Sequence, residues 1–355
     1  MGIALKPIEE QVIVITGASS GIGLATAHSA AKQGAKVVLT ARSEEALADI
    51  SRQISGSGGH AAYVAADVAN RDELNHVAEV AIERFGGFDS WVNNAGVGLY
   101  GRFDEYSEED ARKLFDTNFW GAVHGSMIAA EHLRQRGGAI INVGSVASDN
   151  AIALMGMYSA SKHALRGFTD ALRMELELEK APISVTLIKP TSINTPFPQH
   201  ARNYTEREPQ VPPPVYQPDD VAVAILHACT HSERDIYVGS ASRIMSALGK
   251  YAPRTTDWIT ENVMVPREFR DEPARRPDGT LTNPYDPGHI YGDHPGFVRP
   301  FSIYTRASLH PVLSAAALSL TLAVSAVAVS WLVRELGTTP LMGNGKRDLK
   351  NRFFG

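Results

Sequence analysis

The chain has 355 residues, of which 44% are hydrophobic and 21% charged, and its formal net charge is -5. This composition is that of a globular protein and excludes a collagen-like or disordered chain. The single Cys229 excludes an internal disulfide and favours a reducing compartment. The mixed charge predicts no nucleic-acid partner. Glu9 and Glu10 interrupt the first residues, which therefore predict no secretory signal peptide.

Seven short apolar runs alternate with helical patterns between residue 1 and residue 250. The runs expected to form strands are 12–15, 36–39, 61–66, 90–93, 139–143, 184–188 and 235–238. Strands this apolar are covered on both faces, and helices between them imply right-handed crossovers. The sequence therefore predicts an α/β protein with a doubly wound, mostly parallel sheet and helices on both faces. Its ligand is expected outside the carboxyl ends of the strands, where the strand order reverses.

A glycine-rich loop follows the first predicted strand. The segment from Thr16 to Gly23 carries Gly17, Gly21 and Gly23 and leads directly into a helical pattern. Glycines let the backbone turn tightly and approach a pyrophosphate, and the helix N-terminus offers free N–H groups. In this strand–turn–helix context the loop predicts a dinucleotide site.

Arg42 stands where the second predicted strand ends. A carboxylate there would bind the adenosine ribose, but the sequence offers a fixed cation instead. A guanidinium forks onto phosphate oxygens, so Arg42 favours NADP(H) over NAD(H). The alternative is a solvated surface arginine.

The order of several motifs resembles that of the short-chain dehydrogenase/reductase family over residues 8–245. The matching segments are Thr16–Gly23, Asp67-Val68, Asn93–Gly96, Asn118, Ser145, Tyr158–Lys162 and Pro190–Thr195. The resemblance implies a single Rossmann-fold catalytic domain, here residues 1–250, with a C-terminal extension. One departure is Thr191, where the family often has glycine after the proline.

The predicted catalytic residues are Asn118, Ser145, Tyr158 and Lys162. Tyr158 and Lys162 lie one helical turn apart, so both project from the same helix face. A nearby ammonium stabilises a phenolate, which lets Tyr158 donate a proton to a carbonyl or take one from an alcohol. Ser145 is expected to bind the substrate oxygen. By resemblance, Lys162 also binds the nicotinamide ribose, and Asn118 positions a water that links Lys162 to solvent.

The predicted cofactor-binding residues combine the glycine loop and Arg42 with positions that the resemblance supplies. By resemblance, Asp67 and Val68 flank the adenine, Asn93–Gly96 support the sheet and the cofactor ribose, and Thr195 contacts the carboxamide end. The full set is Gly17, Ser19, Ser20, Gly21, Ile22, Gly23, Arg42, Asp67, Val68, Asn94, Ala95, Gly96, Lys162, Pro190, Ile193 and Thr195. The histidines show no metal-ligand spacing, so no metal is expected.

Residues 251–310 are rich in proline and glycine and form a polar stretch. The prolines and glycines interrupt any helical or strand periodicity after a few residues. We expect an extended arm that packs over the domain or lies as a linker.

Residues 311–333 carry no charge and are long enough to cross a bilayer core of roughly 30 Å. Trp331 and Arg334 resemble an interfacial anchor. We expect membrane association through this segment, with the basic tail, residues 334–355, on anionic lipid and the catalytic domain in the cytoplasm. The alternatives are a buried or dimer-forming helix, and a strand, because residues 318–322 alternate.

The expected function is NADP(H)-dependent hydride transfer to or from a carbonyl or secondary alcohol. Apolar residues near the catalytic tyrosine favour a lipid-, steroid- or isoprenoid-like substrate. The alternatives are an epimerase or dehydratase with retained NAD, and a non-catalytic NADP(H)-binding sensor or scaffold. The family resemblance also implies a homo-oligomer.

Overall fold

Seven apolar strands form one parallel sheet in the computed structural model, which describes residues 3–284, 288–310 and 314. All seven predicted strands are present, and most of their residues are buried on both faces of the sheet. Their bounds are β1 Val12–Thr16, β2 Lys36–Ala41, β3 His60–Ala65, β4 Ser90–Asn93, β6 Gly138–Val143, β7 Ile183–Pro190 and β11 Asp235–Val238. The predicted α/β class is confirmed.

The strand order is β11-β7-β6-β4-β1-β2-β3, so the order reverses between β1 and β4. Both neighbours of β1 run parallel to it, with Ile13 opposite Val37 on one side and Ser90 on the other. The loops after β1 and β4 therefore leave the same edge of the sheet at the reversal, where open α/β sheets bind ligands.

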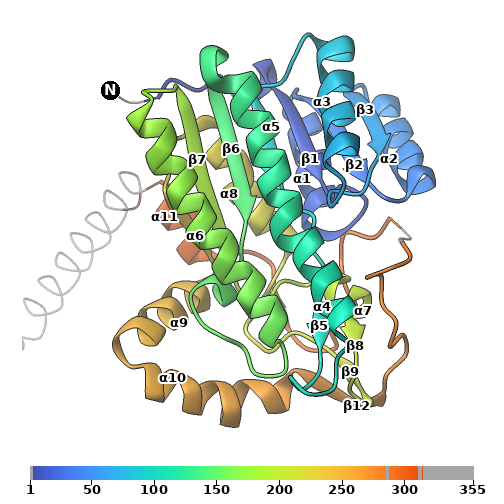
Figure 1. Ribbon diagram of the computed structural model, residues 1–355, viewed down its shortest axis with the longest axis vertical. Helices are drawn as coiled ribbons and strands as arrows, with labels where there is room; N and C mark the ends of the chain where they lie inside the picture. Colours follow the sequence, from blue (N-terminus) through green and yellow to red (C-terminus); the bar gives the residue numbers. More distant parts are fainter. Residues whose placement is uncertain (1–2, 285–287, 311–313, 315–355) are drawn as a thin grey trace, which may run out of the picture. The chain divides into compact units, whose positions relative to one another are not determined.

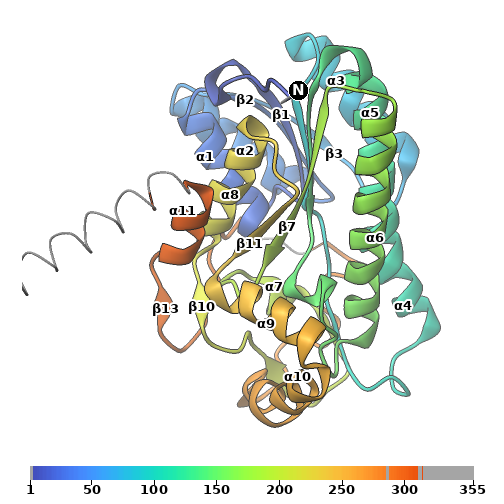
Figure 2. The same ribbon diagram turned by 90° about the vertical axis from the view of Figure 1, so that its left-hand side faces the viewer.

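Helices cover both faces of the sheet (Figure 1, Figure 2). One face carries α1 (Gly21–Lys32), α2 (Glu44–Gly56) and α8 (Pro218–Thr230), and the other carries α3 (Arg71–Phe85), α5 (Gly121–Arg136) and α6 (Gly156–Leu178).

Local signals set the ends of α3. The Asn70 side chain accepts hydrogen bonds from the first-turn amides of Asp72 and Glu73, and Gly86 ends the helix in a left-handed conformation. The core beneath α3 and α5 is apolar, and Phe88 and Trp91 meet there edge to face at 5.3 Å.

Residues beyond 250 pair with the loop that follows β7. Strand β12 (Phe269–Pro273) runs antiparallel to β9 (Arg207–Pro209), and β13 (Val298–Arg299) runs parallel to β10 (Val215–Tyr216). Buried Glu208 accepts hydrogen bonds from the Arg275 backbone amide at 2.7 Å and from its Nε at 3.0 Å. The arm is therefore packed onto the domain rather than lying as a linker, and residues up to 306 form one compact unit.

The beginning of the arm is helical, which corrects the prediction of an extended segment. Helix α9 (Ser240–Tyr251) is followed by α10 (Pro253–Ile259), η4 (Thr260–Met264) and η5 (Val265–Arg267), and α11 (Ile303–Leu309) lies near the other end of the arm. Pro253 occupies the first turn of α10, where a helix needs no N–H and a fixed φ is an advantage. The prolines of this stretch predict an interruption of regular structure, and Pro253 instead begins a helix.

The charge-free segment 311–333 and the tail lie outside the described residues, apart from Ser314, so their membrane association stays a prediction. In the portion of the chain that the structure does describe, we find no helix with the length and apolar character needed to cross a bilayer.

Candidate active site

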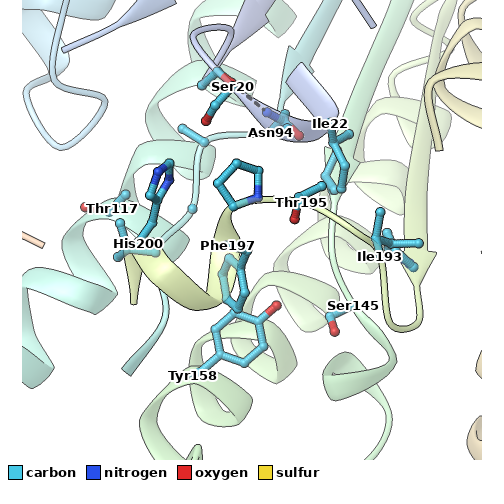
Figure 3. Close-up of a pocket in the computed structure, with 18 of the residues that line it drawn as sticks. Ser20, Ile22, Asn94, Thr117, Ser145, Tyr158, Ile193, Thr195, Phe197 and His200 are labelled. Atoms are coloured by element: carbon cyan, nitrogen blue, oxygen red, sulfur yellow. Dashed lines mark hydrogen bonds between the residues drawn. The ribbon is translucent and has the colours of Figure 1, made fainter. Parts of the chain in front are cut away.

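A cavity of about 280 Å³ lies at the carboxyl ends of the strands, beside the reversal of strand order. Figure 3 shows Tyr158 and Ser145 at one end and Ser20 and Asn94 at the other, with Thr195 between them. Most of the predicted site residues line it: Gly17, Ser19, Ser20, Gly21, Ile22, Arg42, Asp67, Val68, Asn94, Ala95, Gly96, Ser145, Tyr158, Lys162, Pro190, Ile193 and Thr195. Gly23 and Asn118 do not line it, and both lie behind its wall.

The glycine loop leaves no room for side chains. Gly17 and Gly21 have φ values of 63° and 51°, which favour glycine. A Cβ on Gly17 would lie 2.8 Å from Ala95 Cα, and one on Gly23 would lie 2.1 Å from the Gly17 carbonyl oxygen. Ser20 caps α1 without a side-chain hydrogen bond to the first turn. This bare cradle at a helix N-terminus fits the pyrophosphate of a dinucleotide.

Side chains at the ends of β1 and β4 hold the glycine loop in place. The Thr16 hydroxyl accepts hydrogen bonds from the amides of Asn94 at 2.9 Å and Ala95 at 3.0 Å. The Asn94 amide group donates to the carbonyls of Thr16 at 2.9 Å and Gly17 at 3.2 Å. The Asn94 side chain thus fixes the loop, and its contribution to a cofactor site is through this positioning.

Tyr158 and Lys162 are buried side by side on α6. Burial raises the pKa of Tyr158 to about 12, and a hydrogen bond with the Ser145 side chain opposes that rise. Burial lowers the pKa of Lys162 to about 8. The Lys162 ammonium donates to the Val143 carbonyl at 2.9 Å and lies 5.8 Å from the centre of the Tyr158 ring. The end of β6 and helix α6 therefore bring together the hydroxyl groups of Ser145 and Tyr158 and the amine of Lys162.

Asn118 sits in a π-helical turn, η2 (Asp116–Trp120), between α4 (Glu108–Phe115) and α5. Its side chain is almost wholly buried, accepts from the Val97 amide at 2.8 Å and donates to the Val97 carbonyl at 2.9 Å. It also donates to the Ser161 hydroxyl at 3.2 Å. Such turns are frequent at functional sites, and this one ties the loop after β4 to α6.

Arg42 reaches the arm at the opposite end of the cavity. Its guanidinium donates to the backbone carbonyls of Leu281 at 3.2 Å and Thr282 at 3.4 Å, and also to that of Thr280. The arm meets the glycine loop as well, where the Gly21 amide donates to the His289 carbonyl at 2.9 Å. Arg42 therefore lines the cavity with a guanidinium group that already donates hydrogen bonds to backbone carbonyls of the arm.

Sequence reasoning missed the arm residues that line the cavity. They are Met264, Glu268, Thr280 and Pro284. Nothing in a proline-rich polar stretch marks Glu268 as buried, because its burial depends on pairing with a loop about 60 residues earlier in the chain. Within the described ranges, no group of three or more His, Cys, Asp or Glu residues lies in a metal-binding arrangement.

Comparisons with known proteins agree with this geometry. The sequence model of the family described as short chain dehydrogenase matches residues 11–206, more than half of the chain. YxnA, an uncharacterized oxidoreductase of Bacillus subtilis, is 44% identical over 321 residues, which cover 88% of this chain and 89% of that protein. An alignment of this length continues beyond residue 250, so YxnA shares part of the arm sequence.

Solved structures match the main domain. A short chain dehydrogenase/reductase from Burkholderia phymatum in complex with NAD is 27% identical, with a TM-score of 0.62 over 76% of this chain and 99% of that chain. An alcohol dehydrogenase from the archaeon Thermococcus sibiricus, complexed with 5-hydroxy-NADP, is 26% identical, with a TM-score of 0.57 over 64% of this chain and 95% of that chain. The chain therefore belongs to the short-chain dehydrogenase/reductase family and is an NAD(P)-dependent oxidoreductase.

Proposed function

We propose that the protein reduces an apolar carbonyl compound with NADPH, or oxidises the corresponding secondary alcohol with NADP⁺. The observation that carries this proposal is the convergence of Ser145, Tyr158 and Lys162 at one end of a cavity whose other end is the glycine loop. Bound in this cavity, the nicotinamide would supply the hydride in reduction and accept it in oxidation.

Tyr158 acts as the proton donor in reduction. Its hydroxyl is buried and largely protonated at neutral pH, since its pKa is raised to about 12. Ser145 binds the substrate oxygen beside it. When Tyr158 gives its proton to that oxygen, the Lys162 ammonium stabilises the phenolate left behind. Asn118 joins the loop at Val97 to Ser161 of α6. These bonds fix α6 against the loop after β4 and so position Tyr158 and Lys162 in the cavity.

The substrate end of the cavity is mostly apolar, which supports a lipid-, steroid- or isoprenoid-like compound. Ile152, Met155, Phe197, Val211 and Pro212 line it together with Tyr158. The Phe197 ring lies 5.5 Å from the Tyr158 ring and forms a wall beside the predicted proton donor. Methionine adds a flexible surface that accommodates irregular apolar shapes.

The test is oxidation of NADPH, followed by absorbance, across a panel of apolar ketones and aldehydes. We expect turnover by the wild-type chain and a loss of at least about a hundredfold in kcat for Tyr158→Phe, which keeps the ring but removes the proton donor. Unchanged turnover in Tyr158→Phe would contradict the assignment. Binding of NADPH without turnover of any member would favour a sensor or scaffold, and tightly retained NAD would favour an epimerase or dehydratase.

The preference for NADP(H) rests on Arg42, which lies at the cavity edge beyond β2. For Arg42→Ala we expect kcat/KM with NADPH to fall at least about tenfold while kcat/KM with NADH stays within about twofold, because only NADPH carries a phosphate for the guanidinium. An equal fall with both cofactors would mean that Arg42 serves to hold the arm through the carbonyls of Thr280 to Thr282.

We further propose that the protein forms a homo-oligomer through the outer faces of α5 and α6. Met127 of α5, Met174 and Leu178 of α6, and Trp120, which directly precedes α5, are exposed. This is more apolar surface than a solvated helix pair needs. Sedimentation equilibrium of the wild type and Met174→Glu tests this, and a monomeric wild type would contradict it.

A further inference from the structure

Glu268 is a buried carboxylic acid that the arm contributes to the cavity. It lies between η5 and β12, and only 2% of its surface is exposed. Its backbone is fixed on both sides, because its amide donates to the Val265 carbonyl at 3.1 Å and its carbonyl accepts from the Gln210 amide at 2.8 Å. The side chain lines the same cavity as Tyr158.

One oxygen of this carboxyl group, Oε2, has no hydrogen-bond partner among the described residues. Its surroundings are apolar, since Met264, Val211 and Pro212 line the cavity with it and Phe269 packs against Tyr100 at 5.8 Å. A carboxyl oxygen buried without a partner costs free energy, so a ligand group that donates a hydrogen bond to it is favoured at this position. Burial also raises the pKa of Glu268 to about 7, so both protonation states are accessible near neutrality.

Tyr100 connects this carboxyl group with the predicted catalytic end. Tyr100 and Tyr158 belong to one cluster of buried side chains, which also contains Phe269, the residue next to Glu268 in the chain. Tyr100, Tyr158 and Glu268 all line the same cavity. Glu268, Tyr100 and Tyr158 therefore share one apolar chamber. A ligand whose carbonyl met Tyr158 would have room to extend along this chamber towards Glu268.

We propose that Glu268 is a specificity-determining residue that binds a hydroxyl or amino group of the substrate, separate from the reacting carbonyl. This inference rests on the proposed carbonyl reduction. It narrows the substrate class to apolar ketones or aldehydes that carry a second, hydrogen-bond-donating group. A carboxylate accepts from a hydroxyl or an ammonium, and a site built for such a donor discriminates against the analogue that lacks it.

The test uses straight-chain methyl ketones of increasing length, each paired with its ω-hydroxy and ω-amino analogue. For the wild-type chain with NADPH, we expect the kcat/KM of the functionalised ketone to exceed that of its plain partner by about tenfold at the length that reaches Glu268. In Glu268→Leu this ratio falls to one or below, while reduction of the plain ketone is kept or improved. Glu268→Gln keeps a preference for the hydroxyl, which its amide oxygen still accepts, and loses the preference for the amine.

Glu272→Gln is the matched control, because Glu272 lies four residues further along the chain, in β12, and is exposed. It should leave every ratio unchanged. Thermal unfolding shows that the variants are folded, and Glu268→Leu should unfold no more readily than the wild type, since it removes an unpaired buried acid.

Two outcomes separate this inference from the proposed function. Turnover of plain ketones with the same ratio in wild type and Glu268→Leu would overturn the role of Glu268 and leave the proposed function standing. If no ketone is reduced, the proposed function fails, and thermal protection of the NADP⁺-saturated chain by alkanediols against matched alkanols decides the inference. Greater protection by diols in the wild type but not in Glu268→Leu supports it, and equal protection overturns it.

Discussion

At the scale of single residues, burial moves the pKa values of Tyr158 and Lys162 in opposite directions. It raises the first to about 12 and lowers the second to about 8, so each shift favours the neutral side chain. Proton donation by Tyr158 nevertheless depends on a charged Lys162, because a neutral amine stabilises a phenolate far less. The lysine therefore sets the upper pH limit of the proposed reduction.

We expect kcat/KM for carbonyl reduction to hold steady at lower pH and to fall tenfold per pH unit above about pH 8, as Lys162 loses its proton. Lys162→Arg keeps the positive charge at all accessible pH values and should flatten this fall, although with lower activity, since a guanidinium does not reproduce the bond to the Val143 carbonyl. A pH–rate profile of both proteins checks this. A wild-type rate that stays level to pH 10 would contradict it.

Glu268 makes stability depend on pH. Its pKa rises from an ordinary value of 4.5 to about 7 on folding, so the folded state binds its proton more tightly than the unfolded state does. This contribution is complete below about pH 4.5 and is lost as the pH rises through 7. Glu268→Gln stays neutral, and we expect its stability advantage over the wild type to grow by up to about 3 kcal/mol between pH 5 and pH 8. Urea unfolding at both pH values, with Glu272→Gln beside it, measures this difference, and a constant gap would refute it.

At the scale of elements, the sequence predicts the sheet well because each strand is a continuous apolar run next to a turn. The strand at Val12–Thr16 and the glycines after it occur together, and so locate the nucleotide end of the cavity without any tertiary information. The arm has no such apolar runs. Pro253 begins a helix there, and the short strand β12 forms only because it pairs with β9. Glu268 could not be predicted for this reason, since its role follows from contacts with the loop after β9.

Glycine at position 23 is an element-scale requirement, because α1 and the loop after β1 approach each other there. A Cβ would lie 2.1 Å from the Gly17 carbonyl oxygen and 2.6 Å from the Asn94 amide nitrogen. For Gly23→Ala we expect a loss of about 2 kcal/mol in the free energy of unfolding and at least about tenfold weaker NADPH binding. Gly56→Ala is the control, because a Cβ on Gly56 at the end of α2 meets nothing within 4 Å. Calorimetry of NADPH binding decides, and equal affinities for the two variants would argue against a crowded loop.

At the scale of the whole molecule, the arm is held to residues 191–217 by two short strand pairings and by the buried carboxylate of Glu208. Glu208→Ala removes the partner of the Arg275 backbone amide and leaves the Arg275 guanidinium with Asp293 only among the described residues. We expect about 2 kcal/mol lower stability, faster proteolysis after Arg270 and Arg275, and a higher KM for substrate. Glu206→Ala, an exposed neighbour, should change none of these. Limited trypsin digestion followed by mass analysis reads out the arm directly, and equal cleavage of both variants would contradict its anchoring by Glu208.

The pairing of β9 with β12 and of β10 with β13 also orders events during synthesis. A ribosome releases the glycine loop, Ser145, Tyr158 and Lys162 well before it reaches Glu268 and Val298, and chains generally fold from the N-terminal side first. The nascent chain therefore carries the complete set of predicted proton-transfer groups while one wall of its substrate chamber is still untranslated. The wall that would select the substrate is therefore completed last, when β12 pairs with β9 and β13 pairs with β10.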